Sequence, residues 1–413
     1  MPAGITDALA AQIKAMLSRN EATARLLEPG VVAGGPSEED FRKYMVGEQA
    51  TTKVIKETGL SSNESFHAST RRYAFMVIDI HSHIVPALLF ERFAEASGSF
   101  PSVQMERMAD GKGKEAFRFH FPGSIPTRPV IAELSDLAAR KAAMDAEGID
   151  HALLSLWSDL EGYELPNEEG AAWSRFINAC IDDAVKEEPR FTPLASVPLQ
   201  DGALAAAVLK EAAEQNSGGV MIGTLPKGIG GGNLDDPSLD PFWKAASDLG
   251  MAVYIHPMFL CNEPRLLDYE LINTVGRLAD TTIAVGRVIY SGLLQKYPDL
   301  KVVLSHGGAA IPYALGRFQR TYEAAGRKSA DPKDSFSRLY FDSCVYDVDT
   351  LRFLLMKAGA DRILLGSDAP MSIAEAHPVQ FIDRAGLSAD QRQAIVDDNA
   401  RRIFRLRSQC NCN

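Results

Sequence analysis

Eight short apolar runs alternate with longer helical stretches along most of this chain, and this alternation constrains the fold more than any other feature. The stretches between the runs, such as EEGAAWSRFINACIDDAVKEE and DGALAAAVLKEAAEQN, carry apolar residues at helical spacing. Eight strand–helix units in about 330 residues predict an α/β fold of the (β/α)8 TIM-barrel type rather than an open doubly wound sheet. The runs are MVIDI (76–80), HALLSL (151–156), FTPLASV (191–197), GGVMIG (218–223), MAVYI (251–255), KVVLS (301–305), RLYFDS (338–343) and RILLGS (362–367).

Side chains that bind metals stand directly after four of these runs. His81 and His83 follow the first run, His256 the fifth, His306 the sixth and Asp368 the eighth. Alternate residues of a strand share a face, so His81 and His83 are expected to project together. A His-x-His pair alone also fits two loop histidines held by local hydrogen bonds. However, the carboxyl ends of barrel strands meet at one mouth, and four of the chain's eight histidines end predicted strands.

This gathering of ligands predicts one bound divalent metal ion. Neutral imidazoles together with a carboxylate suit a borderline cation, so we expect Zn²⁺, with Mn²⁺ as the alternative. Three histidines and one aspartate leave a coordination position for a substrate oxygen. The sequence therefore favours a catalytic metal site over a closed structural one.

Composition excludes several classes of partner. The net charge of −11 and the pI near 5.3 argue against a nucleic-acid partner and against a basic membrane-binding face. A small carboxylic acid remains a suitable substrate, because a metal and a few arginines reverse the field inside a pocket. The five cysteines form no disulfide framework, and no secretion signal or membrane span is recognisable. We therefore expect a cytoplasmic protein.

The first 75 residues differ from the rest of the chain. Two amphipathic helical stretches are followed by the polar segment GLSSNESFHASTRRY, which is typical of a linker. Residues 1–60 resemble the C-terminal tail of the periplasmic receptors of tripartite tricarboxylate transporters, including its PSEEDFRKYM and VIKETGL segments. We expect a helical extension with its linker at 1–75 and a complete catalytic barrel at 76–413.

The strand-end motifs also resemble those of a known family. IDIHSHI, YIHP, LSHGGAAIPYALGRF and LLGSDAP are similar to motifs of the amidohydrolase superfamily. Within it they resemble the decarboxylase branch typified by 2-amino-3-carboxymuconate-6-semialdehyde decarboxylase. The resemblance implies that the metal ligands are His81, His83, His256 and Asp368. It also implies that His306, together with Asp368, moves the proton in catalysis.

The resemblance bears on the substrate pocket as well. It implies that Arg118, in AFRFHF, pairs with a substrate carboxylate, and that Asn273 replaces a tryptophan that packs on the substrate. It further implies a homodimer, in which an arginine such as Arg327 reaches the neighbouring subunit's site. The segment after the second run adds candidate pocket residues at Trp157, Asp159 and Tyr163.

Three functions are compatible with these residues. The first is a metal-dependent, non-oxidative decarboxylase of an aromatic or conjugated unsaturated carboxylic acid. The second is a metal-dependent hydrolase of a lactone, amide or ring carbonyl that uses the same residues. The third, a non-catalytic binding module, would need a metal site closed to substrate, and the open coordination position argues against it.

Overall fold

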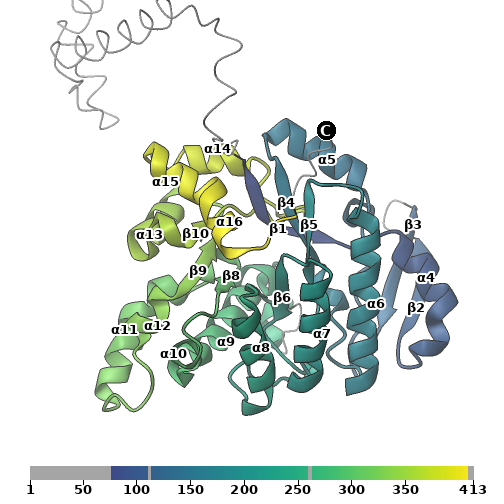
Figure 1. Cartoon of the computed structure of the whole chain (residues 1–413), viewed down its shortest axis with the longest axis horizontal. Helices are drawn as coiled ribbons and strands as arrows, with labels where there is room; N and C mark the ends of the chain where they lie inside the picture. The colour runs from purple at the N-terminus through teal and green to yellow at the C-terminus, as the bar shows by residue number, and fades with distance from the viewer. Residues whose placement is uncertain (1–75, 110–112, 259–262, 408–413) are drawn as a thin grey trace, which may run out of the picture. The chain divides into compact units, whose positions relative to one another are not determined.

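Eight parallel strands form a nearly closed barrel (Figure 1), as the sequence predicted. The computed structural model describes residues 76–109, 113–258 and 263–407, so the expectations for residues 1–75 lie outside the described residues. Neighbouring strands follow chain order, and hydrogen bonds from Ile80 N to Leu365 O (2.9 Å) and from Asp368 N to His81 O (2.8 Å) join the last strand to the first. The barrel strands are β1 (Ile78–Ile84), β4 (His151–Leu156), β5 (Phe191–Ala195), β6 (Gly219–Gly223), β7 (Val253–His256), β8 (Val302–Leu304), β9 (Leu339–Asp342) and β10 (Ile363–Leu364).

Helices surround the barrel. Several begin at an aspartate whose carboxylate accepts hydrogen bonds from the first turn, as Asp136, Asp201 and Asp347 do. The α-helices are α4 (Leu88–Ala96), α5 (Leu137–Glu147), α6 (Asn167–Val185), α7 (Gly202–Glu214), α8 (Asp240–Leu249), α9 (Arg277–Ser291), α10 (Leu293–Lys296), α11 (Ile311–Ala324), α12 (Pro332–Ser337), α13 (Val348–Ala358), α14 (Pro378–Asp383), α15 (Ala389–Gln393) and α16 (Asn399–Ile403). Within the described part of the chain, none is long and apolar enough to cross a bilayer.

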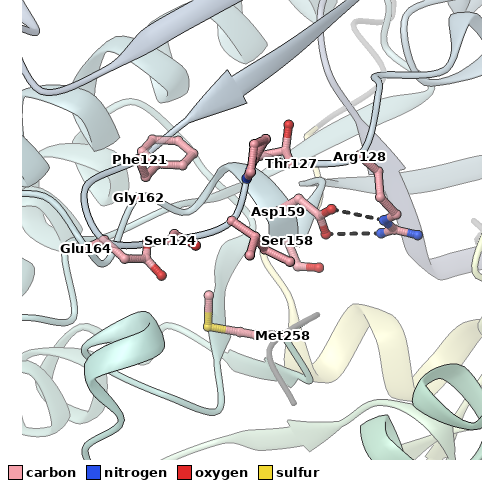
Figure 2. A pocket seen from close by; sticks show the side chains of 11 residues that line it. Phe121, Ser124, Thr127, Arg128, Ser158, Asp159, Gly162, Glu164 and Met258 are labelled. Atoms are coloured by element: carbon pink, nitrogen blue, oxygen red, sulfur yellow. Dashed lines mark hydrogen bonds and ion pairs between the residues drawn. The ribbon is translucent and has the colours of Figure 1, made fainter. Parts of the chain in front are cut away.

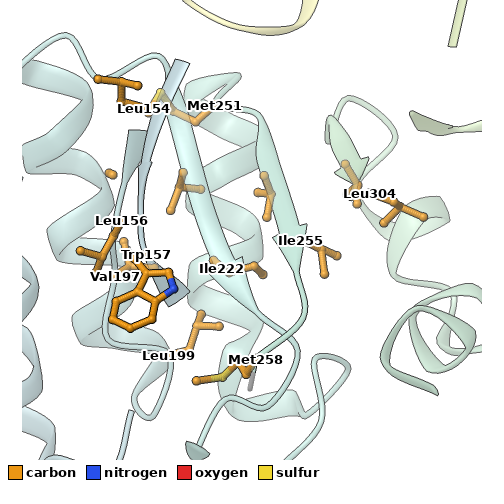
Figure 3. Close-up of a cluster of buried hydrophobic side chains, with 14 of the residues drawn as sticks. Leu154, Leu156, Trp157, Val197, Leu199, Ile222, Met251, Ile255, Met258 and Leu304 are labelled. Atoms are coloured by element: carbon orange, nitrogen blue, oxygen red, sulfur yellow. The ribbon is translucent and has the colours of Figure 1, made fainter. Parts of the chain in front are cut away.

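The apolar core has two parts, one on each face of the barrel sheet. The larger part lies between the strands and the helices; Figure 3 shows a portion of it, with Leu156, Ile222 and Ile255 among its labelled residues. The smaller part fills the barrel interior, and side chains of α16 and of the residue after it belong to this part. This interior cluster consists of Ile78, Ile80, Leu153, Leu194, Met221, Ala252, Tyr254, Val303, Leu364, Ala400, Ile403 and Phe404.

A β-bulge in β1 redirects its side chains. The pairing of β1 with β4 shifts by one residue between Asp79 and Ser82. Ile78 and Ile80 belong to the interior cluster, and strict alternation from them would turn His81 away from the interior. A bulge supplies the extra residue that lets Ile80 and His81 both face inward. The two histidines therefore lie within β1, not after it as the apolar run suggested.

A small hairpin lies outside the barrel, formed by β2 (Gln104–Ala109) and β3 (Glu115–His120). Alternate residues of β3 pack inward: the Phe117 ring stacks on Phe90 of α4 at 4.4 Å, and the Phe119 ring lies 6.0 Å from that of Trp173 of α6. The other face of the hairpin pairs Arg118 with Glu106. Figure 1 shows the hairpin beside α4 and α6, at the periphery of the barrel.

Candidate metal centre

Four side chains converge at the mouth of the barrel. His81, His83, His256 and Asp368 are buried, and one ligand atom from each lies within 4.8 Å of the others. Asp368 Oδ1 lies 3.3 Å from His81 Nε2 and 3.2 Å from His83 Nε2. These are the four ligands implied by the sequence resemblance, and they come from β1, β7 and the segment after β10.

A second carboxylate orients the first of these histidines. His81 Nδ1 lies 2.7 Å from Asp342 Oδ2 at the end of β9. The other donors to this carboxylate are Tyr254 OH (2.9 Å), Gly307 N (2.8 Å) and Cys344 N (3.1 Å). Burial alone would raise the pKa of Asp342, but the hydrogen bond and charge of His81 hold that pKa below its usual value. An ionised Asp342 fixes the proton on His81 Nδ1 and leaves Nε2 to bind a cation.

Close packing beneath His81 also requires a glycine. A Cβ atom at Gly366 would lie 2.9 Å from His81 Cβ and 3.1 Å from Asp342 Cβ. The absence of a side chain there lets the carboxylate and the imidazole approach each other. Any larger residue at this position would displace one of the two.

His83, the second histidine of β1, is oriented by weaker contacts than His81. Ser155 Oγ of β4 lies 3.2 Å from His83 Nδ1. The buried guanidinium of Arg140 on α5 donates to the His83 carbonyl (2.7 Å) and to Ser82 Oγ. Arg140 therefore fixes the backbone that carries His83, whereas Ser155 contacts its ring.

The two oxygens of Asp368 face different groups. Oδ1 faces His81 and His83, whereas Oδ2 lies 3.7 Å from His306 Nε2 and 3.4 Å from Tyr346 OH. Burial would raise the pKa of Asp368, yet the charge of His81 and the close imidazoles of His306, His81 and His83 hold that pKa well below the usual range. This carboxylate is therefore ionised. Oδ1 can bind a cation, while Oδ2 can exchange a proton with His306.

Backbone strain accompanies two of these residues. Asp368 has φ 67° and His306 has φ 52°, and both values lie in the left-handed region, which residues other than glycine rarely occupy. Such conformations cost about 1–3 kcal/mol each and persist where the surroundings impose them. The strain turns both side chains toward the same point of the mouth.

The donor set fits a divalent cation. His81 Nε2 and His256 Nδ1 are buried and have no hydrogen-bond partner among the described residues. Buried polar atoms rarely lack a partner, and a cation bound beside the ionised carboxylate would satisfy both imidazole nitrogens. His306 lies near the cluster with its imidazole in contact with Asp368, and it could act on the substrate instead of on the metal.

A cavity of about 50 Å³, the metal pocket, opens onto three of the ligands, His83, His256 and Asp368. Two of the predicted substrate residues, Trp157 and Asn273, line it with His306. Its cationic wall comes from Arg128 and Arg277. The pocket continues into a larger cavity of about 1180 Å³, which shares both arginines, Asn273 and His306 with it. This larger cavity has room for an aromatic ring.

The two pocket arginines are fixed in different ways. Arg128 stacks on Trp157, its guanidinium carbon 4.9 Å from the ring centroid, and makes two 3.0 Å hydrogen bonds with Asp159. Arg277 donates to Asn273 Oδ1 (3.1 Å) and to the Pro257 carbonyl (3.2 Å). Burial lowers the pKa of Arg277, and the charge of Asp159 counters this effect.

The structure does not bring Arg118 to this pocket. Arg118 lies on β3, where its Nε and Nη2 donate to Glu106 at 2.6 and 3.1 Å. Packing of the neighbouring phenylalanines on α4 and α6 turns Arg118 to the other face of the hairpin. The pocket position expected for Arg118 is filled by Arg128, ten positions later. Arg327 is exposed in the turn after α11 and does not line the metal pocket.

Sequence reasoning missed three groups at this site: Asp342, Arg128 and Arg277. Asp342 ends the seventh apolar run, so the strand-end rule that found the ligands could also have found it. Arg277 follows Asn273 by four residues in a helical segment, a spacing that places both on one face. Of the other candidates, Asp159 lies beside the pocket, whereas Tyr163 is buried with its hydroxyl bonded to Gly223 N (3.1 Å).

A parallel eight-stranded barrel with three histidines and an aspartate at its mouth defines a class of metal-dependent barrel enzymes. The amidohydrolase family model matches residues 78–406, and the chain belongs to this family. The resemblance in the strand-end motifs is thereby confirmed.

Curated relatives and solved structures agree with this assignment. The 2-amino-3-carboxymuconate-6-semialdehyde decarboxylase of Dictyostelium discoideum is 29% identical over 313 residues, covering 74% of this chain and 85% of the relative. The gamma-resorcylate decarboxylase of a Polaromonas strain is 27% identical over 326 residues, covering 71% of this chain and 99% of the relative. The crystal structure of 5-carboxyvanillate decarboxylase from Sphingomonas paucimobilis superposes with a TM-score of 0.66 at 26% identity, covering 81% of this chain and all of that one.

Proposed function

We propose that this protein is a metal-dependent, non-oxidative decarboxylase of an aromatic or conjugated unsaturated carboxylic acid. The observation that carries the proposal is the union, in one pocket, of a buried His3Asp cluster with two arginines, Arg128 and Arg277. The names of the relatives support the same reaction: they include decarboxylases of gamma-resorcylate and of 6-methylsalicylic acid. A hydrolase would use the same cluster, and the reaction products would distinguish it from a decarboxylase.

The reacting carboxylate would be held by the arginines. Guanidinium groups are permanently charged and carry five N–H donors, so Arg128 would offer a carboxylate the Nη donors that Asp159 does not engage. Trp157, on which Arg128 stacks, offers a flat face beside them. We therefore assign substrate orientation to Arg128, Arg277 and Trp157, with Asn273 holding Arg277. The substrate role expected of Arg118 is not part of this proposal, because Arg118 lies on the outer hairpin and lines neither the metal pocket nor the larger cavity.

A proton must reach the carbon that loses CO2. The carbon–carbon bond to the carboxylate breaks, its electron pair stays on the ring carbon, and that carbon takes a proton as CO2 leaves. His306 and Asp368 are the proposed proton carriers, since His306 Nε2 lies 3.7 Å from Asp368 Oδ2 and both line the metal pocket. A bound divalent cation supplies the Lewis acidity that holds and polarises a substrate oxygen.

The test is a product assay with purified full-length protein. A panel of hydroxybenzoates and unsaturated dicarboxylic acids is incubated with metal-loaded enzyme, and CO2 release is measured. We expect CO2 from at least one acid, complete loss of activity after chelation, and recovery with Zn²⁺ or Mn²⁺. Hydrolysis of lactones or amides without CO2 release would identify the alternative, and full activity in verified metal-free protein would refute both.

Finer points belong to the same proposal. We favour Zn²⁺ for its match to imidazole ligands, while manganese is named in the titles of two similar structures, a carboxyvanillate and a dihydroxybenzoic acid decarboxylase. A homodimer, with Arg327 reaching a neighbouring site, rests on family resemblance. A reducing, cytoplasmic setting is supported by the buried free thiols of Cys180 and Cys344. Residues 76–413 are proposed to act without residues 1–75.

A further inference from the structure

A second, smaller cavity adjoins the metal pocket, and we call it the outer cavity. Its volume is about 70 Å³, and it shares Arg128 and Ser158 with the metal pocket. Figure 2 shows it beneath the loop that leads from β3 toward α5, with Arg128 at one end and Glu164 at the other. Its other walls are formed by Phe121, Ser124, Thr127, Asp159, Glu164 and Met258.

The charges around the outer cavity oppose an anion. Among its described lining residues Arg128 is the single cation, and Asp159 engages it through both Nε and Nη2. The Asp159 side chain is 6% exposed and that of Arg128 is 37% exposed, so water screens this pair in part. A second acid, Glu164, stands in the opposite wall and accepts a hydrogen bond from Ile229 N (3.2 Å). A carboxylate placed here would lie near two acidic side chains, Asp159 and Glu164. The Nε and Nη2 donors of Arg128 are already bonded to Asp159.

The remaining walls suit a small uncharged group. Phe121 and Met258 are buried and apolar, while Ser124 and Ser158 bring hydroxyl groups. A water occupies about 30 Å³ in the liquid, so a cavity of this size accepts a group of two or three heavy atoms. A methyl, hydroxyl or methoxy substituent is both uncharged and small enough for this cavity.

We propose that the outer cavity is a substrate subsite for a small uncharged ring substituent, and that Asp159 excludes a second carboxylate from it by occupying Arg128. This inference rests on the proposed function, because it assumes a ring acid whose reacting end lies at the metal pocket. Asp159 acts through Arg128 and is a specificity-determining residue without contact with the reacting atoms. The substrate class narrows to ring acids that carry one carboxylate and a neutral substituent.

Binding of unreactive probes tests the proposal. The probes are 2-nitrophenols that carry hydrogen, methoxy or carboxylate at the same ring position, taken through positions 3 to 6. The nitro group cannot be lost as CO2, and a carboxylate probe is used only where no CO2 release is measured during the titration. Dissociation constants are measured by calorimetry on the manganese-loaded full chain. For at least one position we expect the methoxy probe to bind at least as well as the parent, and the carboxylate probe about tenfold more weakly.

Three variants identify the residue responsible. Asp159→Asn keeps the shape of the side chain but removes the negative charge that Arg128 faces, so the ratio of carboxylate to methoxy affinity should rise about tenfold. Asp159→Glu retains the charge and should keep the wild-type preference. Glu106→Gln is the matched control, since it removes an acid that pairs with an arginine outside the pocket. An unchanged ratio in Asp159→Asn, or an equal shift in Glu106→Gln, would overturn the role of Asp159.

A filled cavity tests the location of the substituent. Ser124→Phe places a ring in the outer cavity and should weaken the methoxy probe at least tenfold while leaving the parent nitrophenol within about twofold. Equal effects on both probes would mean that the substituent lies elsewhere. If no probe binds the wild-type enzyme, the proposed ring-acid pocket fails and this inference fails with it. If the probes bind without the predicted preference, this inference alone fails.

Discussion

Replacing Asp342 by asparagine should weaken metal binding although Asp342 is not a ligand. The carboxylate accepts four hydrogen bonds, from His81 Nδ1, Tyr254 OH and the amides of Gly307 and Cys344. An asparagine offers one acceptor oxygen and turns an NH2 group toward donors. Partners of this kind, which bind a ligating histidine, change metal affinity by about 10–100-fold, or about 1.4–2.7 kcal/mol.

The fold should lose stability by a separate route. At least two of the four donors lose a good acceptor inside the protein, and each unsatisfied buried donor costs about 1–3 kcal/mol. The melting temperature of the metal-free Asp342→Asn protein should therefore fall below that of metal-free wild type. Added metal should recover less of the loss than it does in wild type, because the variant binds metal more weakly.

Competition with a fluorescent chelator gives the metal dissociation constant, and calorimetry of metal-free and metal-loaded protein gives stability. Ser155→Ala is the matched control: it removes one neutral contact to His83 Nδ1, at 3.2 Å, and should weaken binding less than about fivefold. A metal affinity within about threefold of wild type in Asp342→Asn would refute the orienting role. Equal losses in the two variants would show that neither charge nor hydrogen-bond number matters.

Arg128→Lys should lower kcat/KM for the accepted acid by about 10–100-fold, because lysine has no paired donors, while Arg118→Lys should leave it within about twofold; the reverse order would restore the substrate role of Arg118. Glu161 is fully buried, and burial raises its pKa to about 8 from the ordinary 4.5. Its contribution to stability is therefore full below pH 4.5 and is lost as pH rises through 8, so the wild-type melting temperature should fall over this range more steeply than that of Glu161→Gln; parallel melting curves would refute the raised pKa. A chain of residues 76–413 should keep the metal content and kcat/KM of the full chain, and an insoluble or metal-free product would show that residues 1–75 belong to the fold.

The fold and the ligand cluster could be predicted because both depend on local periodicity. Alternating strand and helix patterns define a barrel, and a barrel brings the residues after its strands to one mouth, whatever their separation in sequence. His81 and Asp368 lie 287 positions apart, yet this rule alone places them together. The bulge in β1 could not be predicted, because the register shift arises from pairing with β4 and no residue of the run MVIDI indicates it.

The substrate wall was harder to predict for a physical reason. Arg118 and Arg128 lie on either side of a loop, and composition does not say which of them turns toward the barrel. Tertiary packing decides: Phe117 and Phe119 bind the hairpin to α4 and α6, and the chain then crosses back to Trp157. The resemblance pointed to an arginine near a phenylalanine, and the three-dimensional path selected a different one.

The floor of the barrel has a consequence for how the protein is made. Ala400 and Ile403 of α16, with Phe404 directly after it, belong to the same interior cluster as Ile78 of the first strand. Asp397 also accepts a hydrogen bond from Met76 N (3.2 Å), so residues more than 320 positions apart meet there. On the ribosome the interior stays unsealed until the last helix emerges, about 16 to 65 seconds after the first strand at about 5–20 residues per second. The nascent barrel would thus expose apolar side chains throughout that interval, and its topology makes the incomplete chain prone to aggregation during synthesis.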